Sequence, residues 1–307
     1  MSSRPIAIRT IAVSIALTWG AGAWSAGAWS KDAATIEPIL VAASDSSFSR
    51  PHDLTLSPDR RLLYVADVGN DAVKVLHPDT LATLGVIGRG ELRGPHDVAF
   101  DTKGRLLVAD TQNDRVAIYA LSGLEGILVG AYTKELGSPE GVAVGGDGTI
   151  YVTNARLHDV VAIRNGVVIA RVGRGGSGNN EYRRPHDVAV DALGRVYVAD
   201  PGNDRIQVLG PKLEFIAALG GAPYDFDEPK YLAFDGRGWL YVADEDNNQI
   251  KIFDENRKPL AVIGSGRRGK GADRLNKPEG VEAVGDRVWV SDTYNHRILL
   301  YRLKGAP

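Results

Sequence analysis

One short phrase opens six successive segments of this chain, and the spacing between its copies constrains the fold more than any other feature. Each copy places a proline and one polar residue ahead of a strand-forming run, and the copies begin at Pro51, Pro95, Pro139, Pro185, Pro229 and Pro278. Successive starts lie 44, 44, 46, 44 and 49 residues apart, a repeat length typical of a four-stranded propeller blade. The repeats therefore predict an all-β, six-bladed propeller.

Within one repeat the sequence predicts four short strands joined by tight turns. In the second repeat we expect strands at residues 98–101, 106–110, 115–119 and 126–131. Residues 106–110 are mostly apolar rather than alternating, which is typical of a strand covered on both faces by neighbouring sheets. Each blade should therefore be packed between two others.

The last repeat is incomplete. Few residues remain after the strand expected at residues 297–301, so the sixth blade lacks an outer strand. Residues 35–42, which precede the first repeat, have no strand partner nearby in the sequence. We expect this N-terminal segment to complete the last blade, because that closes the ring and removes an open sheet edge.

The first 28 residues differ in kind from the repeats. Arg4 and Arg9 precede an apolar run over residues 10–19, and small residues follow. This order is typical of a secretory signal peptide over residues 1–28; an uncleaved membrane anchor is the alternative. We therefore expect a propeller domain over residues 33–307, periplasmic or secreted, and without membrane attachment after cleavage.

Composition removes several classes of function. The chain has no cysteine, so no disulfide or thiol chemistry is expected. Its formal net charge is -2 over 307 residues, and no nucleic-acid partner is expected from such a balance.

A second recurring phrase ends the second strand of most repeats. It is a Val-Ala-Asp or Val-Ser-Asp sequence followed by a turn, found at residues 65–71, 108–115, 198–205 and 290–297. These segments resemble NHL repeats. The resemblance implies the propeller fold but not one function, because such folds host lyases, lactonases, ligand sensors and interaction modules.

The aspartate of that phrase is predicted to be scaffold rather than a metal ligand. It recurs in almost every repeat, with an asparagine in the third: Asp67, Asp110, Asn154, Asp200, Asp244 and Asp292. We expect it to cap the amides of the following turn and to pair with the basic residue that begins the next strand.

The residue after each repeat proline varies between repeats, so this position is the candidate for function rather than for scaffold. Innermost strands line the channel of a propeller, so these side chains converge at one mouth of it. They are His52, His96, Glu140, His186, Lys230 and Glu279. Half of the six histidines of the chain thus share one register position with two carboxylates, a donor set that suits a divalent metal, above all zinc.

Alternate blades are the natural three-fold set in a six-fold ring. Blades two, four and six offer His96, His186 and Glu279 as ligands. The other three blades offer His52, Glu140 and Lys230, of which the lysine is expected to hold an anionic substrate. Two alternatives stay open: duplication copies a histidine without function, and a polar ring of this kind also binds channel water.

The Pro-His openings at His52, His96 and His186 also resemble those of peptidyl-α-hydroxyglycine α-amidating lyases. The resemblance implies a catalytic zinc held by histidines at this position, assisted by a tyrosine and an arginine near the mouth. Tyr294 and Arg156 are the matching candidates here. One departure is that His52 and His96 come from adjacent blades, whereas the lyases use alternate ones, so the mixed set with Glu279 is favoured.

Two functions follow as hypotheses. The first is an exported metal-dependent lyase or hydrolase acting on a small or peptidic substrate, with Tyr294, Arg156 and Lys230 as catalytic or positioning residues. The second is a non-catalytic propeller whose loop face binds a protein, a peptide or a cell-envelope ligand. A basic loop at residues 265–277 and an acidic, aromatic loop at residues 222–228 lie on that face and suit a zwitterionic or peptide ligand.

Overall fold

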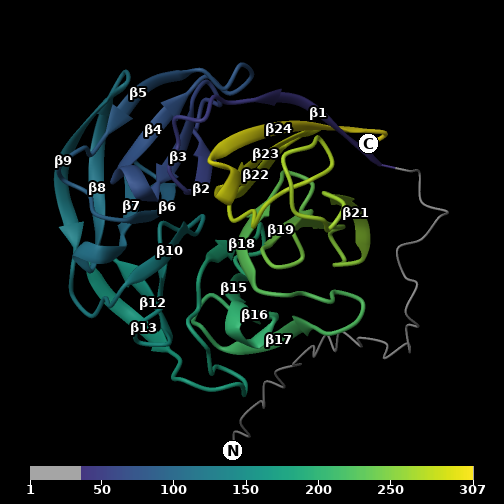
Figure 1. Cartoon of the computed structure of the whole chain (residues 1–307). Coiled ribbons are helices and arrows are strands. Elements are labelled where there is room, and N and C mark those ends of the chain that lie inside the picture. The colour runs from purple at the N-terminus through teal and green to yellow at the C-terminus, as the bar shows by residue number, and fades with distance from the viewer. Residues whose placement is uncertain (1–35, 307) are drawn as a thin grey trace, which may run out of the picture.

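Six four-stranded sheets form a ring around a central channel (Figure 1) in the computed structural model, which describes residues 36–306. Paired strands are antiparallel, and strand order follows the chain outward in five of the six sheets. The predicted six-bladed propeller is confirmed. No helix within the described range is long and apolar enough to cross a membrane, and residues 1–28, predicted to be a signal peptide, lie outside that range.

Strands of equal rank occupy equal places in each blade. The innermost strands are β2 (Pro51–Leu56), β6 (Pro95–Phe100), β10 (Pro139–Val144), β14 (Val188–Val190), β18 (Pro229–Phe234) and β22 (Val281–Val284). The second strands are β3 (Leu63–Asp67), β7 (Leu106–Asp110), β11 (Ile150–Asn154), β15 (Val196–Asp200), β19 (Leu240–Asp244) and β23 (Arg287–Asp292). The third strands are β4 (Ala72–Leu76), β8 (Arg115–Ser122), β12 (Asp159–Arg164), β16 (Arg205–Leu209), β20 (Gln249–Phe253) and β24 (Arg297–Lys304). The outer strands are β5 (Thr83–Ile87), β9 (Glu125–Tyr132), β13 (Val167–Val172), β17 (Phe215–Gly220), β21 (Pro259–Ile263) and β1 (Glu37–Ala43).

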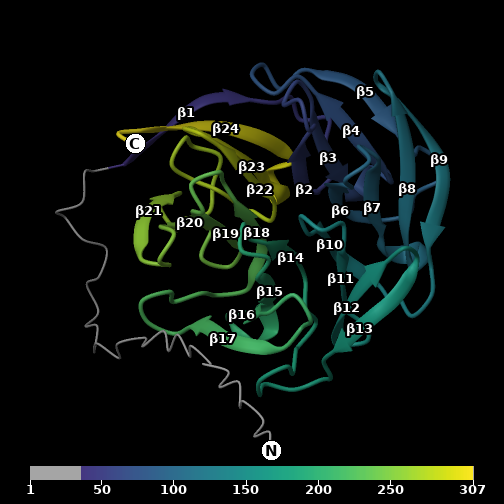
Figure 2. The same cartoon turned by 180° about the vertical axis from the view of Figure 1, so that it is seen from behind.

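The N-terminal strand closes the ring as the sequence predicts. β1 pairs with β24, with Glu37 opposite Lys304 and Leu40 opposite Tyr301. The resulting sheet has the order β1-β24-β23-β22, and both views show β1 running along the outside of β24 (Figure 2). Leu40 also packs on the apolar cluster between the last two blades, so the contact includes core burial as well as backbone pairing.

Neighbouring blades share apolar cores. All five residues of β7 are buried, as expected for the mostly apolar second strands. Between blades one and two, the Tyr64 and Phe100 rings lie 5.2 Å apart, edge to face, in a cluster that includes Tyr119. Burial of each such side chain contributes about 1.5–3 kcal/mol, so the ring is held together at every blade boundary.

One of the two predicted interactions of the recurring aspartate differs in the structure. In blade two, Asp110 Oδ1 accepts a hydrogen bond from the Arg93 amide at 2.7 Å, and Oδ2 accepts from Asn113 Nδ2 and Arg115 Nε at 2.8 and 2.6 Å. The expected cap on the amides of the following turn, η2 (Thr111–Asn113), is absent. The carboxylate points back toward the loop that enters its own blade. The expected pairing with the next basic residue is confirmed.

A second set of hydrogen bonds joins each blade to the next. The residue before each repeat proline has positive φ, and its amide donates to the left-handed residue that ends the turn of the preceding blade. The six donor–acceptor pairs are Arg50–His296, Gly94–Asp71, Ser138–Asp114, Arg184–His158, Glu228–Asp204 and Lys277–Asn248. These bonds, called the inter-blade ring below, fix the backbone where each innermost strand begins.

Replacement of one scaffold aspartate should cost far more stability than loss of a surface ion pair. Asp110 is fully buried, so Asp110→Ala leaves Arg115 without its carboxylate and should lower the free energy of unfolding by about 3 kcal/mol. Asp286→Ala is the matched control, because Asp286 pairs with Arg302 at 3.2 Å with both side chains at least half exposed and should cost less than 1 kcal/mol. Urea denaturation measures both, and equal losses would contradict this role.

Candidate functional site at the channel mouth

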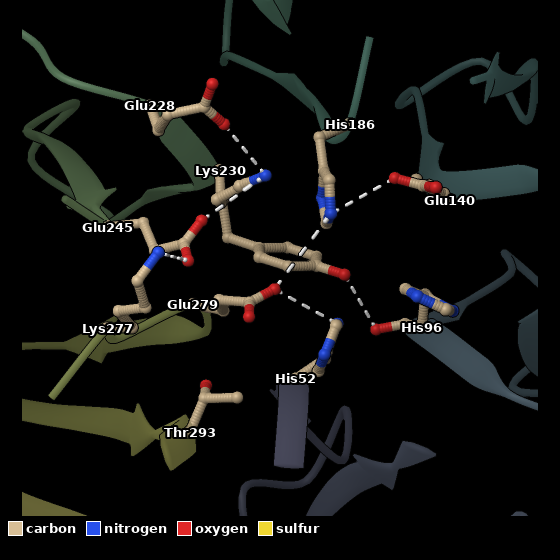
Figure 3. Close-up of polar contacts among 12 residues, drawn as sticks. His52, His96, Glu140, His186, Glu228, Lys230, Glu245, Lys277, Glu279 and Thr293 are labelled. Carbon is tan, nitrogen blue, oxygen red and sulfur yellow. Dashed lines mark hydrogen bonds and ion pairs between the residues drawn. The ribbon is translucent and has the colours of Figure 1, made fainter. Parts of the chain in front are cut away.

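All six side chains that follow the repeat prolines line one cavity at one end of the channel. The cavity has a volume of about 390 Å³. His52, Glu140, His186 and Glu279 are buried, and the close-up shows them with His96 and Lys230 around a common centre (Figure 3). The predicted convergence at one mouth is therefore observed.

Two glutamate–histidine pairs dominate this centre. Glu279 Oε2 lies 3.2 Å from His52 Nδ1, and Glu140 Oε2 lies 3.1 Å from His186 Nε2. Glu279 Oε2 also lies 4.0 Å from His186 Nε2, so it stands between the two imidazoles. The pairs join blade six to blade one and blade three to blade four.

Glycines explain why adjacent blades pair in this way. Gly141 and Gly280 follow the two glutamates, and each packs directly against the backbone of the next blade. A Cβ on Gly141 would lie 2.8 Å from the carbonyl oxygen of His186, and one on Gly280 would lie still closer to that of His52. Absence of a side chain therefore lets each glutamate strand approach its histidine strand.

His96 lines the same cavity but contacts a backbone carbonyl rather than a glutamate. Its Nδ1 lies 2.9 Å from the Gly94 carbonyl oxygen. A carbonyl only accepts, so Nδ1 carries the proton and Nε2 keeps its lone pair. The His96 ring lies 4.6 Å from that of His52 and 6.2 Å from that of His186. The Tyr231 hydroxyl donates to the His96 carbonyl oxygen at 2.9 Å and thus spans the channel.

The donor atoms closest to one another come from His52, His186 and Glu279. One ligand atom from each lies within 4.8 Å of the other two. Nδ1 of His52 and Nδ1 of His186 are buried without a hydrogen-bond partner; His52 Nδ1 lies 3.2 Å from Glu279 Oε2 but without hydrogen-bond geometry. This set fits a divalent cation. The sequence favoured His96 as the second histidine of this ligand set, whereas the structure brings His52 close to His186 and Glu279.

Burial sets the protonation of these groups. It lowers the pKa of His96 to about 4 and the pKa values of His52 and His186 well below the usual range. All three imidazoles are thus neutral near pH 7, which is the ligand form. Burial also raises the pKa of Glu140 to about 7 and, with Glu245 adding to the effect, that of Glu279 to about 8.

The remaining predicted residues lie at different depths. Lys230 Nζ is 3.1 Å from Glu228 and 3.3 Å from Glu245, inside the cavity. Tyr294 lines the outer part of the cavity with nearly half of its surface exposed. Arg156 binds Asp114 at 2.9 Å and lies outside the lining of this cavity.

Two kinds of residue at or next to this mouth were not predicted from the sequence. Arg50, Arg183 and Arg184 line the cavity, and the signal was the Arg-Pro-His-Asp opening shared by repeats one and four. Asp53 and Asp187, which follow two of the histidines, line a second cavity between the innermost strands and not this one. Burial raises the pKa values of both well above the usual range, with Asp97 as the next cause.

This fold and site define a class: a six-bladed β-propeller with a cluster of buried histidines and glutamates at one channel mouth. Comparison with a family model matches residues 92–119, 182–209 and 275–300 to the NHL repeat. The chain is therefore a propeller that contains NHL repeats.

Known proteins with similarity to the chain agree with this fold. NHL repeat-containing protein 3 of Mus musculus is 29% identical over 189 residues, which are 56% of this chain and 45% of that protein. The chain thus matches less than half the length of that relative. Virginiamycin B lyase from Staphylococcus aureus is similar in structure, with a TM-score of 0.60, 12% identity and coverage of 88% and 99% of the two chains. A gluconolactonase from Xanthomonas campestris is also similar in structure, with a TM-score of 0.64, 15% identity and coverage of 87% of this chain and 90% of that one. These similarities support the fold, and such neighbours include lyases and lactonases.

Removal of the close approach at Gly280 should disturb the site. Gly280→Ala places a methyl group against the His52 backbone and should lower the free energy of unfolding by about 1–3 kcal/mol. Gly146→Ala is the control, because no atom lies within 4 Å of its added Cβ and its φ is not positive. Urea denaturation of both variants checks this, and a stable Gly280→Ala protein would show that the approach is not needed.

The pKa of Glu279 predicts a pH-dependent stability of the metal-free protein. Its folded value of about 8 exceeds the ordinary 4.5, so the native state keeps a proton that the unfolded chain releases between these values. The native state is therefore destabilised by this group as pH rises from about 5 to 8. Relative to wild type, Glu279→Gln should be more stable at pH 8 than at pH 5. Denaturation of chelator-treated protein at both pH values tests this, and a pH-independent difference would contradict it.

Proposed function

We propose that this chain is an exported, divalent-metal-dependent lyase or hydrolase that acts on a small or peptidic substrate at the channel mouth. The observation that supports the proposal is the ligand set of His52, His186 and Glu279, whose donor atoms lie within 4.8 Å of one another. Nδ1 of His52, which lies 3.2 Å from Glu279 Oε2, also supports it, because it is buried without a hydrogen-bond partner and such an atom is costly unless a ligand satisfies it.

Zinc is the ion that best fits this donor set, because two imidazoles and one carboxylate leave a coordination position open for water or substrate. When bound, such an ion polarises a substrate oxygen or activates a water molecule. Binding would also favour the ionised form of Glu279, which burial otherwise disfavours. Glu140 Oε2 lies 3.1 Å from His186 Nε2, the nitrogen that also faces Glu279, so it would stand beside the ion as a further ligand.

Other residues of the mouth would bind substrate and move protons. His96 keeps Nε2 free as a proton acceptor or a further ligand, since Nδ1 is bound to Gly94. Burial acts to lower the pKa of Lys230, but nearby carboxylates, led by Glu245, raise it overall, so this lysine stays cationic. Tyr294 is the phenol at the rim for proton transfer, and Arg156 would contact the more distant part of a peptidic substrate.

Metal content separates this proposal from the non-catalytic alternative. Purified mature protein should bind one equivalent of zinc, and a chelator should lower its melting temperature. His52→Ala, His186→Ala and Glu279→Gln should each weaken zinc binding at least tenfold. His77→Asn is the control, because His77 is a histidine in an exposed turn where Nδ1 accepts the Asp79 amide.

Elemental analysis and calorimetric zinc titration measure these effects. Protein without stoichiometric metal, and with a melting temperature insensitive to chelator, would overturn the enzyme proposal and leave a docking propeller.

A further inference from the structure

Three arginines at the channel mouth carry positive charge that the proposed chemistry does not use. Arg50, Arg183 and Arg184 line the same cavity as the histidines. Within residues 36–306, no carboxylate forms an ion pair with the guanidinium of Arg50 or Arg183, and Arg184 approaches Glu140 only at 3.5 Å. All three side chains are exposed, so their charges are open to a ligand.

The lysines of this region, in contrast, are already neutralised by carboxylates. Lys230 lies between Glu228 and Glu245, at 3.1 and 3.3 Å. Lys277 binds the same Glu245 at 2.8 Å and Asp246 at 2.7 Å. A negative ligand group would compete there with protein carboxylates, whereas Arg50 forms no ion pair within residues 36–306 and Arg184 has only the long contact with Glu140.

The backbone positions of Arg50 and Arg184 are fixed by the inter-blade ring. Both residues precede a repeat proline, with φ of 53° and 60°. Their amides donate to Nδ1 of His296 and His158 at 3.1 and 3.0 Å, whereas the other four copies of this bond use an Asp or Asn oxygen. They belong to blades one and four, three blades apart in a ring of six, so they stand on opposite sides of the channel.

The charged residues that line the cavity indicate the sign of the charge that a ligand would carry. Four basic side chains and four carboxylates line it, so a bound divalent cation would leave a net positive mouth. Burial is the main cause of the lowered pKa of His96, and the charges of Arg50, Lys230 and Arg184 add to it. The guanidinium groups of Arg50 and Arg184 therefore both act on the same group at the mouth.

We propose that Arg50 and Arg184 form an anion clamp across the mouth, and that the substrate is a small organic anion whose carboxylate or phosphate binds this clamp. The inference rests on the proposed function and specifies its substrate class. Guanidinium groups suit both anions because their planar donors bind two oxygens at once.

The test uses the full mature protein, freed of metal so that an anion cannot bind to an ion instead. Benzoate, phenyl phosphate and the neutral benzamide are titrated by calorimetry into wild type, Arg50→Gln, Arg184→Gln and Arg89→Gln. Arg89 provides the matched control, since it is an exposed arginine in the loop entering blade two that does not line the cavity.

At least one of the two anions should bind to wild type and to Arg89→Gln, whereas benzamide should bind to neither. Arg50→Gln and Arg184→Gln should each weaken anion binding at least tenfold. Preference for benzoate or for phenyl phosphate identifies the substrate group. Equal binding of benzamide, or anion binding unchanged in Arg50→Gln and Arg184→Gln, would overturn the clamp.

Zinc titration of the same variants keeps the two proposals distinguishable. Zinc binding should be retained in Arg50→Gln and Arg184→Gln, because neither residue belongs to the ligand set. Anion binding to the clamp in a protein that binds no zinc would refute the enzyme while supporting the clamp. Zinc binding together with anion binding that is unchanged in Arg50→Gln and Arg184→Gln would support the enzyme while refuting the clamp.

Discussion

The close approach of neighbouring innermost strands is the constraint on which the site depends. Gly141 and Gly280 have no side chain, so the backbones of His186 and His52 lie directly against them. This contact brings a glutamate from one blade beside a histidine from the next. Four buried polar side chains therefore share a small volume, where burial keeps the imidazoles neutral and disfavours ionised glutamates.

The same contact gives the mouth an approximate two-fold repeat within its six-fold ring. Blades six and one contribute the sequence elements Glu-Gly and Arg-Pro-His-Asp, and blades three and four contribute the same elements. The two histidines that accept amide bonds in the inter-blade ring, His158 and His296, follow this repeat. Blades two and five break it, with His96 on one side and Lys230 on the other. The mouth thus has a neutral histidine on one side and, opposite it, a lysine that is paired with two carboxylates.

The sequence predicted the fold because the repeats are regular. Spacing of the prolines, apolar second strands and the unpaired segment before Pro51 were sufficient for six blades and for closure by β1. It also predicted that the residues after the prolines converge, since innermost strands line the channel.

Details of the site depend on packing that the pattern does not show. A regular ring suggested alternate blades and hence His96, whereas the glycine contacts bring His52 to Glu279. Arg50 and Arg184 were missed because their position relies on positive φ before a proline, a conformation that the residue before proline seldom adopts. The scaffold aspartates were assigned to the wrong amides, because a carboxylate at a strand end reaches the entering loop as easily as the following turn.

The most direct test of the account is anomalous diffraction at the zinc absorption edge from crystals of the zinc-treated mature protein. The account predicts a single strong peak bonded to His52, His186 and Glu279 at distances of about 2.0–2.2 Å. An empty mouth, or zinc held only by other residues such as Asp53 and Asp187, would contradict it.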